Sequence, residues 1–241
     1  MKHLKTIFSV LTLLAAVSCA KTPSATGGQV NFMVSSNQNV ADVTKSNVSD
    51  YTTLPSSADF TITISGEEFS WTGKISEWNT STALIAGEYS VTATYGDIED
   101  EGFDKPFFTG TETFTVKGGE DTAVSIPVSL GNAIVRMTFT EWFDNYYPDY
   151  TFKLTRNGAD IVTFKKGETR AAFIDPYKFK LEGTLIGEMK SAIISKDYSN
   201  LNEATAYTFN FDLTNVGGAA ITIKFNDTVE TIELGDYELN D

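Results

Sequence analysis

The sequence predicts an all-β protein with two tandem antiparallel β-sandwich domains. Apolar and polar residues alternate with a period of two along most of the 241-residue chain, and no long stretch has the period of a helix. About six or seven short alternating runs occur within each hundred residues or so, and glycines separate them at turn-like intervals. One β-sandwich has about this size and number of strands, so the chain is long enough for two.

The first nineteen residues have the features of an export signal. Lys2 and Lys5 precede an apolar run over residues 7–17, which is shorter than the roughly 20 residues that a spanning helix needs. The run ends in Ala-Val-Ser-Cys, and Cys19 is the single cysteine of the chain. This ending resembles the lipobox of bacterial lipoproteins. The resemblance implies cleavage between Ser18 and Cys19 and lipidation of Cys19.

The predicted anchor sets the domain organisation. Residues 1–18 are expected to be a removed lipoprotein signal peptide, and residues 19–28, which are small and polar, a flexible tether. The first sandwich is then 29–130 and the second 131–241, because the last alternating run of one passes almost directly into the first run of the other. Ala20 is not the aspartate that retains some lipoproteins at the inner membrane. We therefore expect the outer membrane, on either its cell-surface or its periplasmic face.

The strand predictions rest on alternating runs rich in β-branched and aromatic residues, which suit a pleated and half-buried surface. In the first domain the runs are 30–34, 60–64, 89–95, 114–116 and 124–130. In the second domain they are 135–139, 152–154, 177–181, 207–213, 221–225 and 232–234.

Composition excludes several classes of function. The precursor has 32 acidic and 18 basic side chains, so a nucleic-acid partner is not expected. Removal of the signal peptide would take away His3, the single histidine, and lipidation of Cys19, the single cysteine, would leave no free thiol. Nucleophile pairs with histidine and Cys/His zinc sites are then excluded. Pairs of carboxylates are too frequent here to indicate catalysis. We therefore predict a protein that is not an enzyme and has no cofactor.

Three motifs of the first domain resemble a known family. Residues 58–64 form an opening strand, residues 85–93 contain a Gly-x-Tyr-x-Val-x-Ala strand, and the segment 103–110 precedes a further strand. With the lipobox, these motifs resemble the Bacteroidetes lipoproteins of domain of unknown function 4493, over about residues 59–187. The resemblance implies an exported, lipid-anchored β protein of unassigned activity. A more distant resemblance is to fimbrillin-type lipoproteins, which implies immunoglobulin-like or transthyretin-like sandwiches.

Two functional hypotheses follow. The first is a surface binding or adhesion module, held at the membrane by lipid on Cys19, with a protein or a glycan as ligand. The second is an anchor or accessory subunit of a fimbria-like assembly. A stalk subunit of the kind that is matured by proteolytic cleavage at an arginine is disfavoured. Cleavage after Arg136, Arg156 or Arg170 would remove or destroy a whole sandwich.

An acidic loop over residues 97–104 is a candidate metal site. Its five carboxylates belong to Asp97, Glu99, Asp100, Glu101 and Asp104. Loops rich in oxygen bind calcium, but this one lacks the alternating Asp-x-Asp-x-Asp-Gly order of known calcium loops. A solvated acidic turn is the favoured alternative.

An aromatic segment over residues 141–150 is a candidate ligand site. Its candidate residues are Trp142, Tyr146, Tyr147 and Tyr150. Aromatic faces beside Asp and Asn side chains can stack on sugar rings, and loops on a rigid scaffold commonly carry binding sites. The favoured alternative is that the aromatics cap one end of the second sandwich or fill the junction between the two.

Overall fold

The structure is a computed structural model. It describes residues 26–41, 46–187, 191–213, 220–225 and 228–233. The predicted cleavage site between Ser18 and Cys19 and the lipidation of Cys19 lie outside this part of the chain. Within it, no helix is long and apolar enough to span a membrane.

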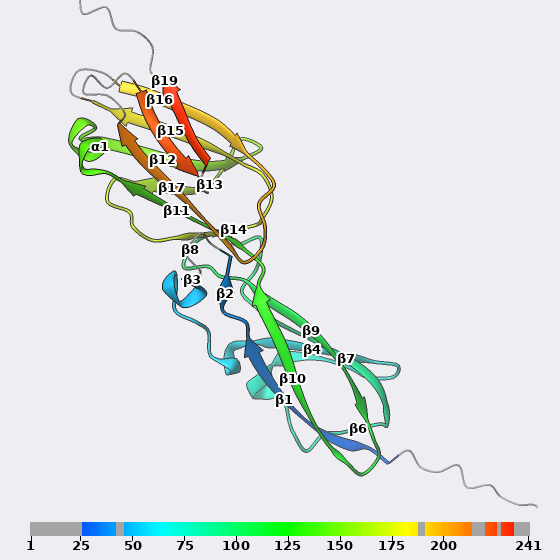
Figure 1. Ribbon diagram of the computed structural model, residues 1–241. Helices are drawn as coiled ribbons and strands as arrows, with labels where there is room; N and C mark the ends of the chain where they lie inside the picture. The colour runs from blue at the N-terminus through cyan, green and yellow to red at the C-terminus, as the bar shows by residue number, and fades with distance from the viewer. Residues whose placement is uncertain (1–25, 42–45, 188–190, 214–219, 226–227, 234–241) are drawn as a thin grey trace, which may run out of the picture.

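The described chain is all-β, as predicted, with one short helix, α1 (Glu141–Tyr146), and three single 3-10 turns (Figure 1). The strands of the first half are β1 (Gly28–Ser36), β2 (Asn39–Val40), β3 (Ser46–Asn47), β4 (Thr61–Gly66), β5 (Ser70–Lys74), β6 (Ala83–Leu84), β7 (Gly87–Tyr95), β8 (Gly102–Phe103), β9 (Phe108–Val116) and β10 (Asp121–Leu130). Those of the second half are β11 (Ala133–Phe139), β12 (Asp149–Arg156), β13 (Ala159–Lys165), β14 (Ala172–Ile174), β15 (Phe179–Ile186), β16 (Ser191–Tyr198), β17 (Thr205–Leu213), β18 (Ala220–Phe225) and β19 (Thr228–Glu233).

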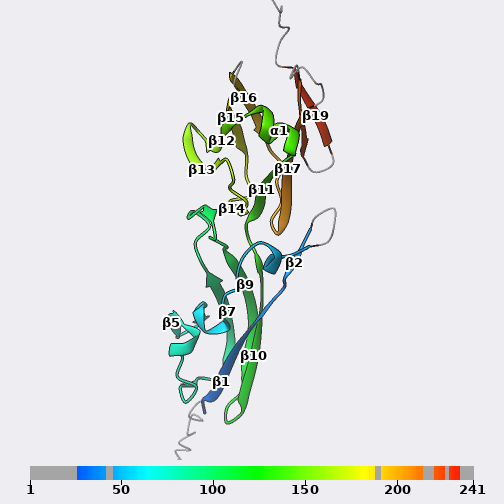
Figure 2. The same cartoon turned by 90° about the vertical axis from the view of Figure 1, so that its left-hand side faces the viewer.

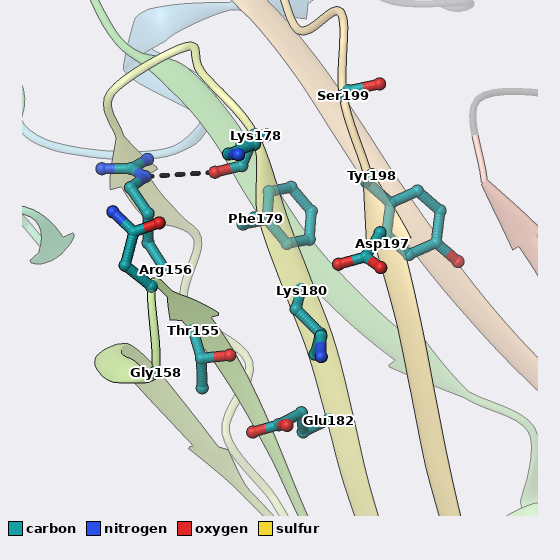
Figure 3. A pocket seen from close by; sticks show the side chains of 11 residues that line it. Thr155, Arg156, Gly158, Lys178, Phe179, Lys180, Glu182, Asp197, Tyr198 and Ser199 are labelled. Atoms are coloured by element: carbon teal, nitrogen blue, oxygen red, sulfur yellow. Dashed lines mark hydrogen bonds between the residues drawn. The ribbon is translucent and has the colours of Figure 1, made fainter.

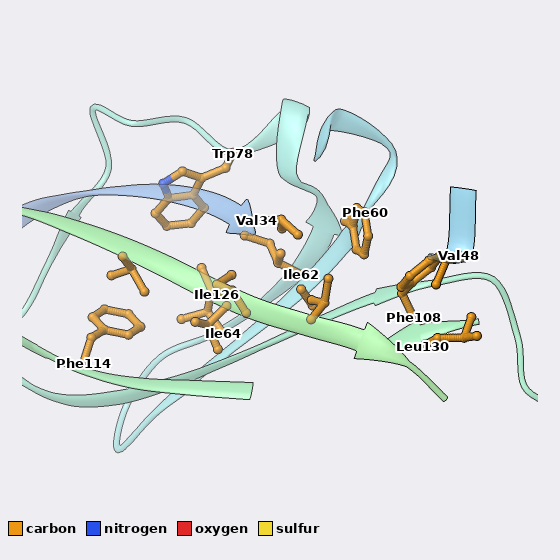
Figure 4. Close-up of a cluster of buried hydrophobic side chains, with 14 of the residues drawn as sticks. Val34, Val48, Phe60, Ile62, Ile64, Trp78, Phe108, Phe114, Ile126 and Leu130 are labelled. Atoms are coloured by element: carbon orange, nitrogen blue, oxygen red, sulfur yellow. The ribbon is translucent and has the colours of Figure 1, made fainter. Parts of the chain in front are cut away.

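The first half folds around one hydrophobic core. A seven-stranded sheet in the order β5-β4-β7-β9-β10-β1-β6 surrounds it, and β9 pairs with β10 only at Phe108–Thr109 and Ser129–Leu130. The alternating residues of β4, β7 and β10 point inward, as the period of two requires. Figure 4 shows part of this core, in which Phe60, Ile62 and Ile126 are fully or almost fully buried.

The second half folds around a second core. A six-stranded sheet has the order β19-β18-β17-β11-β14-β8, and a four-stranded sheet has the order β13-β12-β15-β16. Both sheets contribute fully buried side chains to this core, such as Phe209 and Phe211 from β17 and Phe152 and Leu181 from β12 and β15. The second core is therefore held by contacts between strands that are far apart in the sequence.

Two strand pairs depart from the purely antiparallel arrangement that the sequence predicted. β1 runs parallel to β10, with Gln29 opposite Asp121, and β11 runs parallel to β17, with Ala133 opposite Thr205. An alternating pattern shows which face of a strand is buried but does not encode the direction of its neighbour. Parallel pairing needs a long crossover connection, and each of these pairs is separated by most of one half of the chain.

The junction between the halves is short and continuously packed. β10 ends at Leu130 and β11 begins at Ala133. Ile134, Phe173 and Ala206 come from the second half but belong to the first core. The buried Asn132 accepts a hydrogen bond from the backbone N–H of Phe107 through its side-chain oxygen. The division into two sandwiches at residues 130 and 131 stays a prediction.

A tyrosine at the start of β7 fixes the chain where it enters the sheet. The Tyr89 hydroxyl donates a hydrogen bond to the carbonyl oxygen of Ile85, at 2.9 Å, and the ring stacks on Phe114 with centroids 5.5 Å apart. Gly66 lies opposite Tyr89 in the sheet, where a Cβ atom would be only 2.4 Å from the tyrosine ring. This contact resembles the tyrosine corner of β-sandwich proteins.

Candidate functional site

The predicted aromatic site lies between β11 and β12 and is mostly core. The Thr140 side chain caps α1 by accepting a hydrogen bond from the backbone N–H of Phe143, at 3.3 Å. The helix turns Phe143 fully inward, and Tyr147 and Tyr150 are buried as well. Trp142 is 75% exposed and Tyr146 is partly exposed. Ligand binding in this segment stays a prediction that now concerns Trp142 and Tyr146.

Hydrogen bonds hold this aromatic end in place. The Tyr150 hydroxyl donates to a carboxylate oxygen of Asp144 at 2.7 Å, and burial together with Asp144 raises the pKa of Tyr150. Burial, with a smaller contribution from Tyr146, raises the pKa of Tyr147 to about 12. The Lys166 ammonium donates to the carbonyl oxygens of Asp144 and Tyr147, at 2.9 and 3.0 Å. These contacts make the segment a rigid cap over the second core.

Other large apolar side chains are exposed at the same end of the molecule. Asp149, which begins β12 just after α1, lies opposite Ile186 in the sheet. Ile186 is 46% exposed, and Ile193, its diagonal neighbour on β16, is 80% exposed. Figures 1 and 2 show α1 at one end of the elongated molecule and the start of β1 at the opposite end. We call the region of Trp142, Ile186 and Ile193 the distal end.

A shallow hollow of about 390 Å³ lies at the other end of the four-stranded sheet (Figure 3). It is lined by residues 155–158, 178–180, 182 and 197–199. A second hollow, of about 280 Å³, shares Glu182 and extends to Ile193. Lys180 lies opposite Asp197, and Glu182 lies opposite Lys153, so charges of opposite sign alternate along β15. The surface suits a polar ligand that lies along the strands.

Sequence reasoning missed these hollows. Alternating lysine and glutamate residues on a strand are typical of a solvated face, and Lys180 and Asp197 are seventeen positions apart in the chain. Their juxtaposition depends on the register between β15 and β16. Alternation on β15 is the one signal that the sequence offered, and it indicates only that these side chains face the solvent.

Three of the five carboxylates of the acidic loop pair with cations. Asp100 pairs with Lys105, Glu101 pairs with Arg156 at 2.8 Å, and Asp104 pairs with Arg170 at 3.1 Å. Asp97 uses a side-chain oxygen to accept the backbone N–H of Glu99, at 3.0 Å. Among the residues that the structure describes, no group of three or more His, Cys, Asp or Glu side chains could hold a metal ion. Calcium binding by this loop stays the less favoured hypothesis, and the acidic turn stays the prediction.

Comparison with solved structures finds proteins that resemble this chain over most of its length. A candidate polysaccharide-binding protein from Bacteroides thetaiotaomicron has a TM-score of 0.47 and 12% identity, over 86% of this chain and 98% of that one. A candidate cell adhesion protein from Bacteroides ovatus has a TM-score of 0.47 and 12% identity, over 90% and 100%. A fimbrial protein from Bacteroides ovatus has a TM-score of 0.37 and 12% identity, over 77% and 48%.

A comparison with curated protein sequences finds no match. Comparison with protein families finds one match over most of the chain, at residues 27–235, which extends beyond both ends of the resemblance seen in the sequence. The match confirms that resemblance. The chain belongs to the DUF4493 family, whose defining domain is described as a domain of unknown function.

Proposed function

We propose that this protein is a binding or adhesion module of the bacterial cell envelope that does not act as an enzyme. In this proposal, lipid on Cys19 anchors it to the outer membrane, and two tandem sandwiches, 29–130 and 131–241, carry the ligand-binding surface away from the membrane. The ligand is a protein or a glycan, the classes suggested by the words adhesion and polysaccharide-binding in the names of the structural neighbours.

The observation that carries the proposal is the position of the exposed apolar side chains at the distal end. Trp142 and Ile193 are 75% and 80% exposed, at the end of the molecule opposite the start of β1. A large apolar side chain that stays exposed to water does not gain the favourable free energy that burial of apolar surface gives on folding. Tryptophan is also among the residues that contribute most to binding energy in interfaces. A chain tethered through its N-terminus would present this end to an outside partner.

The second candidate function is that of an anchor or accessory subunit in a fimbria-like assembly. Among the described strands, β5, β13 and β16 each pair on one side only, so their free edges can accept an added strand. Arg136 lies within β11 and Arg156 ends β12, so cleavage at either would cut through a sheet of the second half. This position argues against maturation at an arginine and hence against a stalk subunit.

Binding assays on the mature protein test the leading proposal. Purified protein is applied to arrays of glycans and of extracellular proteins, as wild type and as the Trp142→Ala and Ile193→Ser variants. We expect wild type to bind and both variants to lose binding while their circular dichroism spectra stay unchanged. Met33→Ala is the matched control, because Met33 is exposed on β1 in the first half. Equal loss in Met33→Ala, or a wild type that binds nothing, would contradict the proposal.

Cell fractionation tests the anchor separately. A Cys19→Ala variant is expected to leave the membrane fraction as a soluble precursor, whereas wild type stays with the outer membrane. Protease treatment of intact cells then distinguishes the cell surface from the periplasm. Wild type in the soluble fraction would contradict the lipid anchor without affecting the binding proposal.

A further inference from the structure

The acidic loop at residues 97–104 crosses from the first half of the chain to the second. Its end forms β8, which pairs antiparallel with β14 and becomes the edge strand of the six-stranded sheet. Phe103 lies opposite Ala172, and its ring packs edge to face on Phe164 of β13, with centroids 5.0 Å apart. A segment of the first half thus completes both a sheet and a core contact of the second.

A partly buried ion pair fixes the middle of this loop. The side chains of Glu101 and Arg156 are 13% and 18% exposed, and their closest N–O distance is 2.8 Å. The other oxygen of Glu101 accepts the backbone N–H of Asp175, also at 2.8 Å. Arg156 further donates to the carbonyl oxygens of Asp175 and Lys178, both at 3.1 Å. The planar guanidinium therefore satisfies three acceptors at once, which a lysine could not do with the same geometry.

A second arginine holds the end of the loop. Arg170 donates to Asp104 at 3.1 Å, and its guanidinium carbon lies 4.5 Å from the centre of the Phe103 ring. Glu168 orients the same guanidinium through hydrogen bonds of 2.8 and 3.0 Å. The site is half exposed, so each contact alone is weak, but the contacts combine charge pairing with stacking on one aromatic face.

The third arginine also reaches across the junction. Arg136 on β11 lies over the ring of Tyr51, which belongs to the first half, at 5.7 Å from the ring centre. The chain contains just three arginines, at positions 136, 156 and 170. Each of them lies in the second half and contacts the first. Backbone hydrogen bonds between Ala41 and the segment 204–206 add a further link across the junction.

We infer that the acidic loop is a strap that locks the two halves into one rigid rod, and that two of its carboxylates, those of Glu101 and Asp104, serve to pair with arginines of the second half. Two units joined by a short linker move relative to each other unless their interface is large or specifically held. Here strand pairing, a partly buried ion pair and an aromatic contact hold one loop in place. The strap thereby fixes the distance between the start of β1 and the distal end.

Spin-label distance measurements on the full chain test this inference. In a Cys19→Ser background, Thr113→Cys and Ser195→Cys place one label on an exposed strand position of each half. We expect a single narrow distance distribution for this protein. Glu101→Gln and Arg156→Gln should each broaden it, and combining them should add little, since both remove the same pair. Arg170→Gln should broaden it less, because its pair is half exposed.

Lys105→Gln is the matched control, because Lys105 directly follows the acidic loop and pairs with Asp100 inside the same half of the chain. It should leave the distribution narrow. A broad distance distribution in the labelled protein whose acidic loop is unchanged would overturn the inference, even if the loop variants fail to fold. Broadening by Lys105→Gln equal to that by Arg156→Gln also overturns it. Failure of the binding proposal would leave these distances unchanged, so the two ideas are tested independently.

Discussion

The Tyr89 hydroxyl allows a stability prediction with a defined size. Tyr89→Phe removes the hydrogen bond to the Ile85 carbonyl oxygen, which measures 2.9 Å, and leaves the ring in its stack with Phe114. A neutral hydrogen bond contributes about 1 kcal/mol net. The Ile85 residue is half exposed, so water can reach its carbonyl group once the hydroxyl is gone. We therefore expect the free energy of unfolding to fall by about 1 kcal/mol.

Equilibrium urea denaturation measures this change, with circular dichroism as the signal. For a chain of this size, a loss of about 1 kcal/mol corresponds to a fall in Tm of roughly 2 to 4 °C. Tyr177→Phe is the control, because the Tyr177 side chain is exposed and should tolerate loss of its hydroxyl. Tyr89→Ala should cost about 3 to 5 kcal/mol, since it also removes the packed ring. Equal stabilities of Tyr89→Phe and wild type would refute the assigned role of the hydroxyl.

Three further predictions concern the core, the alkaline limit and the metal hypothesis. Gly183→Ala should lower the free energy of unfolding, measured by urea denaturation, by about 1 to 3 kcal/mol, because the new Cβ would lie 2.6 Å from the Phe152 ring. Gly87→Ala is the control: its new Cβ would meet nothing closer than 4.0 Å, so the free energy of unfolding should stay unchanged. Because the pKa of Tyr147 is raised to about 12, the folded protein holds this proton more tightly than the unfolded chain, so the contribution of Tyr147 to stability should be constant below about pH 10 and be lost from there to about pH 12. Replacing Tyr147 with Phe should reduce that fall, and an unchanged pH profile would count against the assignment. Calorimetric titration with millimolar calcium should give no heat of binding, because three of the five carboxylates at residues 97–104 are already paired with cations. A saturable heat of binding would restore the calcium hypothesis.

The local alternation of apolar and polar residues was enough to predict that the protein is all-β. Alternation in segments such as 60–64 and 89–95 predicted strands that the structure contains, with the expected residues buried. The same pattern could not assign strand direction, so the parallel pairing of β1 with β10 was not foreseen. The reason is that a pleat orients side chains in the same way whichever direction the neighbouring strand takes.

For the candidate sites too, the sequence located each segment, and the tertiary structure decided what its side chains contact. Composition located the aromatic segment, but Tyr147 and Tyr150 are buried while Trp142 is exposed, and this division depends on how α1 packs against the second core. Composition also located the acidic loop. Its proximity to Arg156 and Arg170 depends on strand pairing between β8 and β14.

The sequence by itself determined the all-β class, the expected export signal and the absence of histidine after His3, because each is a local or compositional property. Tertiary structure alone decided which aromatic residues reach solvent, where the hollows of the four-stranded sheet lie, and what the acidic loop contacts. Glu101 and Arg156 are 55 positions apart and meet because β8, a strand of the first half, joins a sheet of the second half. Such a contact depends on long-range register, which no short stretch of sequence encodes.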